Sequence, residues 1–288
     1  MLSERILGRV QTYSHREWPL HDVAHTRLLE GLPCTHPAEM PPMEAAGLAL
    51  ARLTLALAPH ASVVWIASGP GNNGGDGMVA ARYLHQWGKQ AILTLLHDPE
   101  HSPHAARQAW QTAQSAGLRM QQEPPPTWDI CIDALFGIGS KRPITASYAD
   151  WVERMNTSAA PTIAADIASG LDADTGVAAP AHVQADYTLS LLTLKPGLFT
   201  ASGRDASGEI WFNDLDQHHK LPPQARLTPL PARVLRPHAS HKGSYGDVAI
   251  VGGASGMFGA ALLAGRSALQ GGAGRVFVCP LDANAASL

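Results

Sequence analysis

Short apolar runs alternate with helical patterns between residues 61 and 212. Runs typical of β-strands occupy 61–67, 91–96, 128–133, 161–167, 183–192 and 209–212. Helical patterns lie between several of them, at 78–87, 102–116 and 146–157. Strand, turn and helix in this alternation favour a mostly parallel sheet that is covered by helices on both faces.

The pattern changes at both ends of the chain. Residues 1–58 read as helical, with prolines separating two segments, whereas 216–240 is polar and rich in proline, a composition typical of a linker. Beyond the linker, the strand, helix and strand patterns at 248–251, 259–269 and 276–279 predict the opening of a new βαβ unit. We therefore divide the chain into a first domain at 1–215, a linker at 216–240, and a second domain at 241–288. Because 48 residues are too few to bury a core, we expect that second domain to be truncated.

Composition narrows the function classes. With 45% hydrophobic and 16% charged residues, the chain is typical of a soluble globular protein. A formal net charge of −3 gives no electrostatic footprint for nucleic acid or an anionic membrane, so we expect a small-molecule partner. The chain has no apolar run long enough for a signal peptide or membrane helix, and Cys34, Cys131 and Cys279 form no CxxC pair. These features predict a cytoplasmic protein.

The most unusual segment is the glycine-rich stretch Gly69–Gly77, which directly follows the run at 61–67. Glycines let a backbone approach an anionic ligand closely and adopt positive φ, and the N–H groups at the start of the next helix would hold phosphate. The segment is neither a G-x-G-x-x-G fingerprint nor a Walker A loop. Segments 133–143 and 166–172 also follow predicted strands, so all three should meet at the carboxyl edge of the sheet.

Further motifs accompany the glycine-rich segment in chain order. They are Met43-Glu-Ala-Ala-Gly47, Asp133-Ala-Leu-Phe-Gly137, Asp166-Ile-Ala-Ser-Gly-Leu171, Ala185-Asp-Tyr-Thr-Leu189 and Lys195-Pro-Gly197. Together, over roughly residues 20–215, they resemble the YjeF-type N-terminal domain of the NAD(P)H-hydrate epimerases. The resemblance implies a Rossmann-like three-layer α/β/α sandwich that interconverts the R and S forms of hydrated NADH or NADPH.

The resemblance continues beyond the linker. His241–Gly246 and Gly252–Ala261 are similar to the opening of the ADP- or ATP-dependent NAD(P)H-hydrate dehydratase, a ribokinase-like domain. The late glycine-rich motif of that family, with its catalytic aspartate, has no counterpart before Leu288. We therefore expect ADP or ATP to serve only the missing dehydratase half, and no dehydratase activity from this chain.

The family also implies roles for residues that match its motifs. Asp166 would be the catalytic residue at the nicotinamide ring. Asn73, Asp133 and Ser169 would give oxygen ligands to one potassium ion, a chemically sensible set for a hard cation. The expected substrate-binding residues, besides Asp166, are Asn72, Asn73, Gly74, Gly75, Asp76, Gly137, Ile138, Gly139, Ser140, Lys141, Arg142 and Pro143.

The chemistry can be reasoned independently of the family. In hydrated NAD(P)H the C6 hydroxyl lies beside the ring nitrogen, as in a hemiaminal. Inversion at C6 requires either loss of the hydroxyl to an iminium or opening of the ring, and then return on the other face. Both routes move a proton on and off oxygen, which one positioned carboxylate can do with a rate gain of roughly 10² to 10⁴.

Purely structural interpretations remain open for three candidate residues. Asp166 could be a helix N-cap or turn residue, Asp133 could form a strand-end turn, and Lys195 could lie on the surface as readily as in an active site. The chain also departs from the family pattern, because Ala168 replaces the usual proline, and Ile138 and Ser140 replace the usual threonine and leucine.

Other functions also remain open. The main alternative is a non-catalytic nucleotide-binding scaffold of the same fold. A sugar- or hydroxymethylpyrimidine-kinase relative would need the missing phosphate-transfer motif, and a Rossmann dehydrogenase would need a G-x-G-x-x-G sequence at its first strand. A homodimer or higher homo-oligomer is expected, because epimerases of this type often pair through their N-terminal helices.

Overall fold

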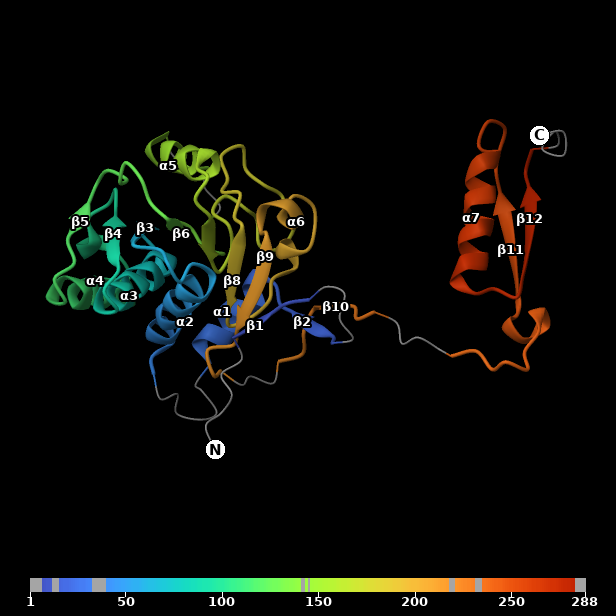
Figure 1. Cartoon of the computed structure of the whole chain (residues 1–288), viewed down its shortest axis with the longest axis horizontal. Coiled ribbons are helices and arrows are strands. Elements are labelled where there is room, and N and C mark those ends of the chain that lie inside the picture. Colours follow the sequence, from blue (N-terminus) through green and yellow to red (C-terminus); the bar gives the residue numbers. More distant parts are fainter. Residues whose placement is uncertain are drawn as a thin grey trace. The chain divides into compact units, whose positions relative to one another are not determined.

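The chain folds into two compact units, Met1–Leu230 and Pro231–Leu288, in a computed structural model (Figure 1). The structure describes residues 7–11, 16–32, 40–140, 143–144, 146–217, 221–230 and 235–282. None of the helices in these ranges is long and apolar enough to span a membrane.

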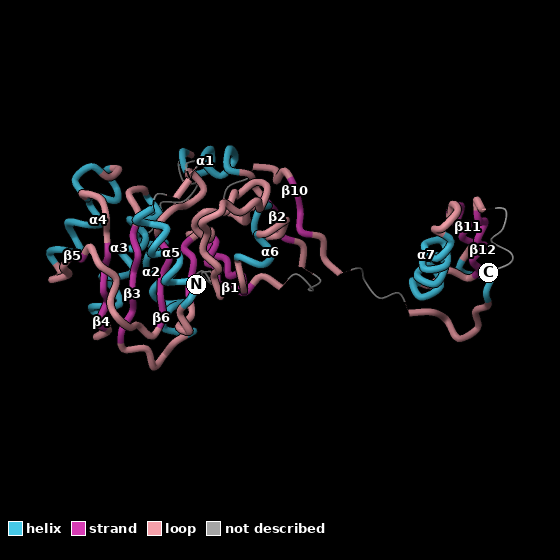
Figure 2. The backbone as a smooth tube through the Cα atoms, turned by 90° about the horizontal axis from the view of Figure 1, so that it is seen from above, coloured by secondary structure: helices cyan, strands magenta, loops and turns pink. Residues whose placement is uncertain are grey.

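A mostly parallel sheet organises the first unit. Among the described residues it has eight strands in the order β1-β9-β8-β7-β6-β3-β4-β5, and every neighbouring pair is parallel except β1 with β9. In Figure 2, β3, β4 and β6 run side by side. The strands are β1 Leu7–Arg9, β3 Val63–Ser68, β4 Gln90–Thr94, β5 Met120–Gln121, β6 Ile130–Ala134, β7 Thr162–Ala165, β8 Tyr187–Leu191 and β9 Glu209–Asn213. The predicted mostly parallel sheet is confirmed.

Helices cover both faces of this sheet. Alternate residues of β3 point to opposite faces, as in any strand: Val64 and Ile66 join the core beneath α2, α3 and α4, whereas Trp65 packs against Trp151 of α5. Figure 1 shows α5 on the other side of the sheet from α2, α3 and α4. The helices are α1 Val23–Gly31, α2 Pro42–Leu57, α3 Asn72–Gln86, α4 His104–Ser115, α5 Ala146–Thr157 and α6 Gly203–Ala206, with short 3-10 turns η1 Pro99–His101 and η2 Pro196–Leu198. The fold is the expected three-layer, Rossmann-like sandwich.

Two short pairings differ from the sequence prediction. The segment before residue 58 contains strands as well as helices, because β1 pairs with the edge strand β9 and β2 (Trp18–Leu20) pairs with β10 (Ala225–Leu227). Strand β10 lies within the stretch expected to be a linker. Each strand has only three residues, and its partner is far away in the sequence. Such strands are formed by tertiary pairing rather than by local preference.

The second unit is a small βαβ arrangement. The unit begins with the 3-10 turn η3 (Lys242–Tyr245). Strand β11 (Asp247–Gly252) follows and runs parallel to β12 (Arg275–Pro280), and helix α7 (Phe258–Gly271) connects the two strands. This is the strand, helix and strand expected from the sequence. Large apolar side chains of this unit, including Leu263 and Phe277, are exposed.

Candidate functional site

Three neighbouring strands end together at the carboxyl edge of the sheet. Strands β3, β6 and β7 are adjacent, and their register places Ala67 beside Asp133 and Asp133 beside Ala164. The segments that follow these strands are the glycine-rich stretch, the segment after Ala134 and the segment from Asp166. The sequence predicted this convergence on one edge, and the structure confirms it.

The glycine-rich stretch is helical over most of its length. Helix α3 begins at Asn72, six residues before the predicted helix at Met78, and Gly71 is its N-cap with no side-chain hydrogen bond. The first N–H groups of α3 therefore lack side-chain caps and suit an anionic ligand. The expectation of positive φ is wrong, because no glycine between residues 69 and 77 has it.

These glycines instead permit close packing. A Cβ on Gly69 would lie 1.7 Å from the carbonyl oxygen of Leu135, and one on Gly74 would lie 1.9 Å from that of Gly69. A Cβ on Gly77 would lie 2.6 Å from the Cβ of Ala134. The missing side chains let the start of α3 sit directly against the segment that follows β6.

Asp133 is fully buried at the end of β6 and organises the next two segments. Its Oδ1 accepts hydrogen bonds from the Ser169 hydroxyl at 2.6 Å and from the Leu135 N–H at 3.1 Å, while Oδ2 accepts the Ser169 N–H at 2.8 Å. Burial raises the pKa of this carboxyl to about 6, against the effect of these hydrogen bonds. Asp133 is thus a central, desolvated group of the edge.

Asn73 of α3 lies close to the segment that Asp133 and Ser169 hold in place. The Ser169 hydroxyl accepts the Phe136 N–H at 2.9 Å, and a Cβ on the adjacent Gly137 would lie 3.3 Å from the Asn73 side chain. Asn73 is buried, and its Nδ2 has no hydrogen-bond partner among the described residues. The amide oxygen of Asn73, the carboxylate of Asp133 and the hydroxyl of Ser169 are the oxygen donors that suit a hard cation, whereas the unpartnered Nδ2 suits an acceptor atom of a ligand.

Asp166 follows β7 in an unusual conformation. Its φ is +66°, a region that few residues other than glycine adopt, and its N–H donates to the Leu189 carbonyl at 2.8 Å. Its Oδ1 accepts the Leu191 N–H at 3.0 Å. Asp166 is therefore neither a helix N-cap nor part of a strand, and β8 holds its side chain in place.

Lys195 lies against Asp166 and is completely buried. Its ammonium group donates to Asp166 Oδ1, to the Leu191 carbonyl at 2.8 Å and to the Ser190 hydroxyl at 3.4 Å. The alternative that placed Lys195 on the surface is wrong. The sequence contained a signal for this position, because Lys195 lies in the otherwise apolar stretch 194–199. A lysine that such a stretch carries into the interior is expected to have a charged partner.

Two more acidic side chains interact with this pair. Partial burial raises the pKa of Asp76 well above its ordinary range, and the charges of Asp166 and Glu30 raise it further while Lys195 opposes them. The pKa of Glu30 is raised by desolvation and then by Asp166. The cluster formed by Asp76, Asp166, Lys195 and Glu30 is named here the acid–lysine cluster.

Helix α1 brings Glu30 to this cluster, and the sequence prediction missed it. Contacts hold the helix there: the His21 N–H donates to the Leu194 carbonyl at 2.8 Å, and the Thr26 and Thr193 hydroxyls are 2.8 Å apart. Glu30 belongs to an ordinary amphipathic pattern, so the sequence contains no local signal for its position.

The remaining predicted substrate residues have varied positions. Asn72 is exposed at the start of α3, Gly75 is buried, Ile138 packs against an apolar core, Ser140 donates its N–H to the Gly137 carbonyl at 3.2 Å, and Pro143 is exposed. A Cβ on Gly139 would lie 2.8 Å from the guanidinium of Arg27 on α1. Lys141 and Arg142 lie outside the described residues.

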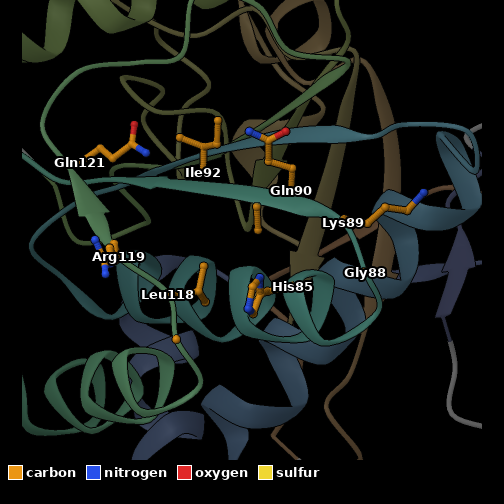
Figure 3. A pocket seen from close by; sticks show the side chains of 10 residues that line it. His85, Gly88, Lys89, Gln90, Ile92, Leu118, Arg119 and Gln121 are labelled. Carbon is orange, nitrogen blue, oxygen red and sulfur yellow. The ribbon is translucent and has the colours of Figure 1, made fainter.

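A pocket of about 450 Å³ lies elsewhere, at the end of α3 and beside β4 (Figure 3). Its walls include the basic residues His85, Lys89 and Arg119, but none of the predicted site residues. Lys89 already donates to the carbonyls of Pro59 and Ala61. The pocket is therefore separate from the carboxyl-edge cluster.

The motifs at this edge match a known protein family. The model of the family described as "YjeF-related protein N-terminus" matches residues 41–197. The chain belongs to this family. The match includes the starts of α2 and α3, Asp133, Asp166 and Lys195, which are the elements that build the edge described above.

Full-length relatives have related names. The chain is 34% identical over 249 residues to the "Bifunctional NAD(P)H-hydrate repair enzyme Nnr" of Thermofilum pendens, covering 81% of this chain and 47% of the relative. The enzymes of the same name from Escherichia coli and Vibrio cholerae are 35% and 36% identical, covering 80% and 81% of this chain and 47% and 49% of the relatives. The chain thus spans about half the length of the curated relatives it matches.

A solved structure has a similar fold. The crystal structure of the yeast protein YNL200c matches 65% of this chain and 85% of its own chain, with a TM-score of 0.56 and 21% sequence identity. At this identity the likeness supports the fold of the YjeF-related domain.

Proposed function

We propose that the first unit interconverts the R and S epimers of hydrated NADH and NADPH at C6 of the nicotinamide ring. The observation that carries this proposal is the carboxyl edge itself, where a buried aspartate–lysine pair lies in the acid–lysine cluster beside an uncapped helix start. The names of the relatives, which are NAD(P)H-hydrate repair enzymes, support the choice of substrate.

Asp166 is the group that moves the proton. In the ring-opening route, its carboxylate accepts the hydroxyl proton while the C6–N bond breaks, its electron pair passes to nitrogen and a C6 carbonyl forms. Nitrogen then attacks the other face of the carbonyl carbon and the proton returns to oxygen. In the iminium route, the hydroxyl takes a proton and leaves as water, and the carboxylate accepts a proton from the water that adds to the opposite face.

Asp76 suits the iminium route in particular. Its raised pKa favours the neutral carboxylic acid more than in an ordinary aspartate, and a neutral acid can supply the proton that the departing hydroxyl needs. A carboxylic acid and a carboxylate that act together are a recurring arrangement in acid–base enzymes. The cluster thus offers an acid and a base to one carbon atom.

The start of α3 and the segment from Gly137 would bind the dinucleotide. The unpaired N–H groups after Gly71 are positioned for a pyrophosphate, and the Arg27 guanidinium beside Gly139 adds positive charge at the same edge. We propose the substrate-binding roles of Asn72–Asp76 and of residues 137–143 on this basis.

A potassium ion would bind at Asn73, Asp133 and Ser169. The fit rests on the chemistry of the donor set: the amide oxygen of buried Asn73, the Asp133 carboxylate and the Ser169 hydroxyl are all oxygen ligands. When bound, the ion would supply a positive charge that favours the ionised form of Asp133. These three residues also fix the segments after β6 and β7, which hold the substrate and Asp166.

The test is direct. Purified protein is mixed with one epimer of hydrated NADH, and the R/S ratio is followed by chromatography in potassium buffer and in choline buffer. The proposal predicts interconversion well above the spontaneous rate, with faster turnover in potassium. A ratio that drifts at the spontaneous rate in both buffers would refute the activity and favour a non-catalytic nucleotide-binding scaffold.

A further inference from the structure

Lys195 is the most completely buried charged group of the acid–lysine cluster, and the proton-transfer scheme above does not use it. Burying a lysine side chain removes the hydration of its ammonium ion, so the charged form persists only with close partners. Here the three N–H donors have three acceptors, namely Asp166 Oδ1, the Leu191 carbonyl and the Ser190 hydroxyl. No donor is left for a substrate.

The contacts of Asp166 are one-sided. Among the described residues, both side-chain hydrogen bonds of Asp166 end on Oδ1, from Lys195 and from the Leu191 N–H. Oδ2 is therefore the oxygen available to the substrate, and the side chain keeps 14% of its surface exposed. One oxygen anchors the carboxylate and the other can exchange a proton.

The backbone on both sides of the pair is unusual as well. Asp166 has a φ of +66° and Leu192 a φ of +62°, conformations that are unfavourable for residues other than glycine. The ion pair joins these two segments, which follow the adjacent strands β7 and β8. Such a conformation persists only where surrounding contacts fix it, and the buried lysine supplies several of these contacts.

The surrounding charges explain why a cation is needed. The charge of Asp166 raises the pKa of Asp76 on α3 and of Glu30 on α1, whereas Lys195 lowers both and is paired directly with Asp166. His21 also interacts with Lys195. Burial lowers the pKa of His21 most, and the charges of His25 and Lys195 lower it further. Without Lys195 the Asp166 carboxyl would keep the Leu191 N–H but lose its cationic partner.

We propose that Lys195 is the positioning residue of the epimerase site, which holds Asp166 as a carboxylate with Oδ2 directed away from the ion pair. The proposal rests on the proposed function. Lys195 contacts neither substrate nor reacting atoms, and it acts entirely through Asp166.

The experiment compares Lys195→Met, Lys195→Arg and the control Lys89→Met. Lys89 also donates to two backbone carbonyls, but far from the cluster. For Lys195→Met we expect the acidic limb of the kcat–pH profile to move to higher pH, because the favourable charge of the ion pair is gone. At neutral pH kcat also falls by about tenfold, because the carboxylate is no longer fixed in its productive orientation, and KM stays near its wild-type value. Lys195→Arg returns the limb toward wild type, and Lys89→Met leaves it unchanged.

A stability cycle separates this inference from the proposed function. Urea unfolding is measured for Asp166→Asn, Lys195→Met and the double variant; coupling predicts that the double variant is more stable than the sum of the single losses implies. A wild-type protein that fails to interconvert epimers would refute the proposed function and the positioning role with it, whereas the cycle would still report on the pair. Two results with an active wild type would overturn the positioning role alone. One is that the acidic limb of the kcat–pH profile does not move in Lys195→Met; the other is that Lys195→Met and Lys195→Arg have the same acidic limb.

Discussion

The two ends of strand β6 use the same residue type in opposite ways. Asp129, just before the strand, is exposed and accepts the N–H groups of Ser62 and Val63 at 2.7 and 2.8 Å. These hydrogen bonds lower its pKa. Asp133, within the strand at the other end, is fully buried, and burial raises its pKa to about 6.

The same contrast extends to the lysines. At the amino edge, partly exposed Lys89 satisfies backbone carbonyls. At the carboxyl edge, Lys195 is fully buried against another ionisable group. Asp129 and Lys89 thus keep much of their hydration, whereas Asp133 and Lys195 lose theirs where strand ends and helix starts meet. That comparison can be tested by matched changes at the two edges.

The largest effect should come from Asp166→Asn. Asparagine tolerates positive φ and keeps an oxygen for Lys195, but it cannot accept and return a proton, so interconversion should fall by roughly 10²- to 10⁴-fold. Stability should also fall, on the order of 3 kcal/mol, because Lys195 loses its charged partner. Chromatographic rates and urea unfolding measure both. Asp129→Asn is the matched control, and an equal loss of rate in the two variants would contradict the contrast between the edges.

Asp133→Asn should remove the response to potassium. Both carboxylate oxygens of Asp133 accept hydrogen bonds. Asparagine would remove the negative charge, and its NH₂ group would face a hydrogen-bond donor. We expect the potassium concentration for half-maximal rate to rise by roughly 10- to 100-fold or the stimulation to vanish. Potassium titrations of the rate provide the measurement. An unchanged titration curve would show that Asp133 is not a ligand.

Gly74→Ala should destabilise the domain more than Gly88→Ala. The new methyl group at residue 74 would meet the Gly69 carbonyl oxygen at 1.9 Å, whereas Gly88 has open space and only a positive φ of 81°. We expect a loss of roughly 1–3 kcal/mol or more for the first change and about 1 kcal/mol for the second. Urea unfolding decides this, and equal losses would mean that α3 can move away from the segment that follows β6.

Stability should also depend on pH with opposite sign at the two ends of β6. Because Asp133 has a pKa of about 6 in the folded chain and an ordinary value of 3.8, the folded state binds more protons than the unfolded state between these values. Its contribution to stability therefore falls as pH rises from about 4 to about 6, by on the order of 2–3 kcal/mol. Asp129 has a lowered pKa, so its contribution is present above pH 3.8 and is lost as pH falls below that value.

The free energy of unfolding is measured in choline buffer at several pH values for the wild type, Asp133→Asn and Asp129→Asn. These measurements separate the contributions of Asp133 and Asp129. The difference between wild type and each variant removes the titrations that they share, including that of Asp76. Slopes of the same sign for the two aspartates would contradict the assigned environments.

Much of the fold could be read from local pattern. Short apolar runs, the glycines after the first run and the aspartates at run ends located β3, β6 and β7 and their common edge, because adjacent parallel strands must end together. The motifs also located Asp166, Asp133 and Asn73. The strands β1, β2 and β10 were missed, since three-residue pairings depend on partners far away in the chain.

The sequence by itself determined the alternation of strands and helices and the residues available at strand ends, because side-chain periodicity and backbone freedom are local properties. Only the tertiary structure decided that Lys195 is buried against Asp166, that α1 delivers Glu30 to the same cluster, and that the glycines serve close packing rather than positive φ. The reason is physical: desolvation and charge coupling depend on neighbours that the strand order and the docking of α1 bring together.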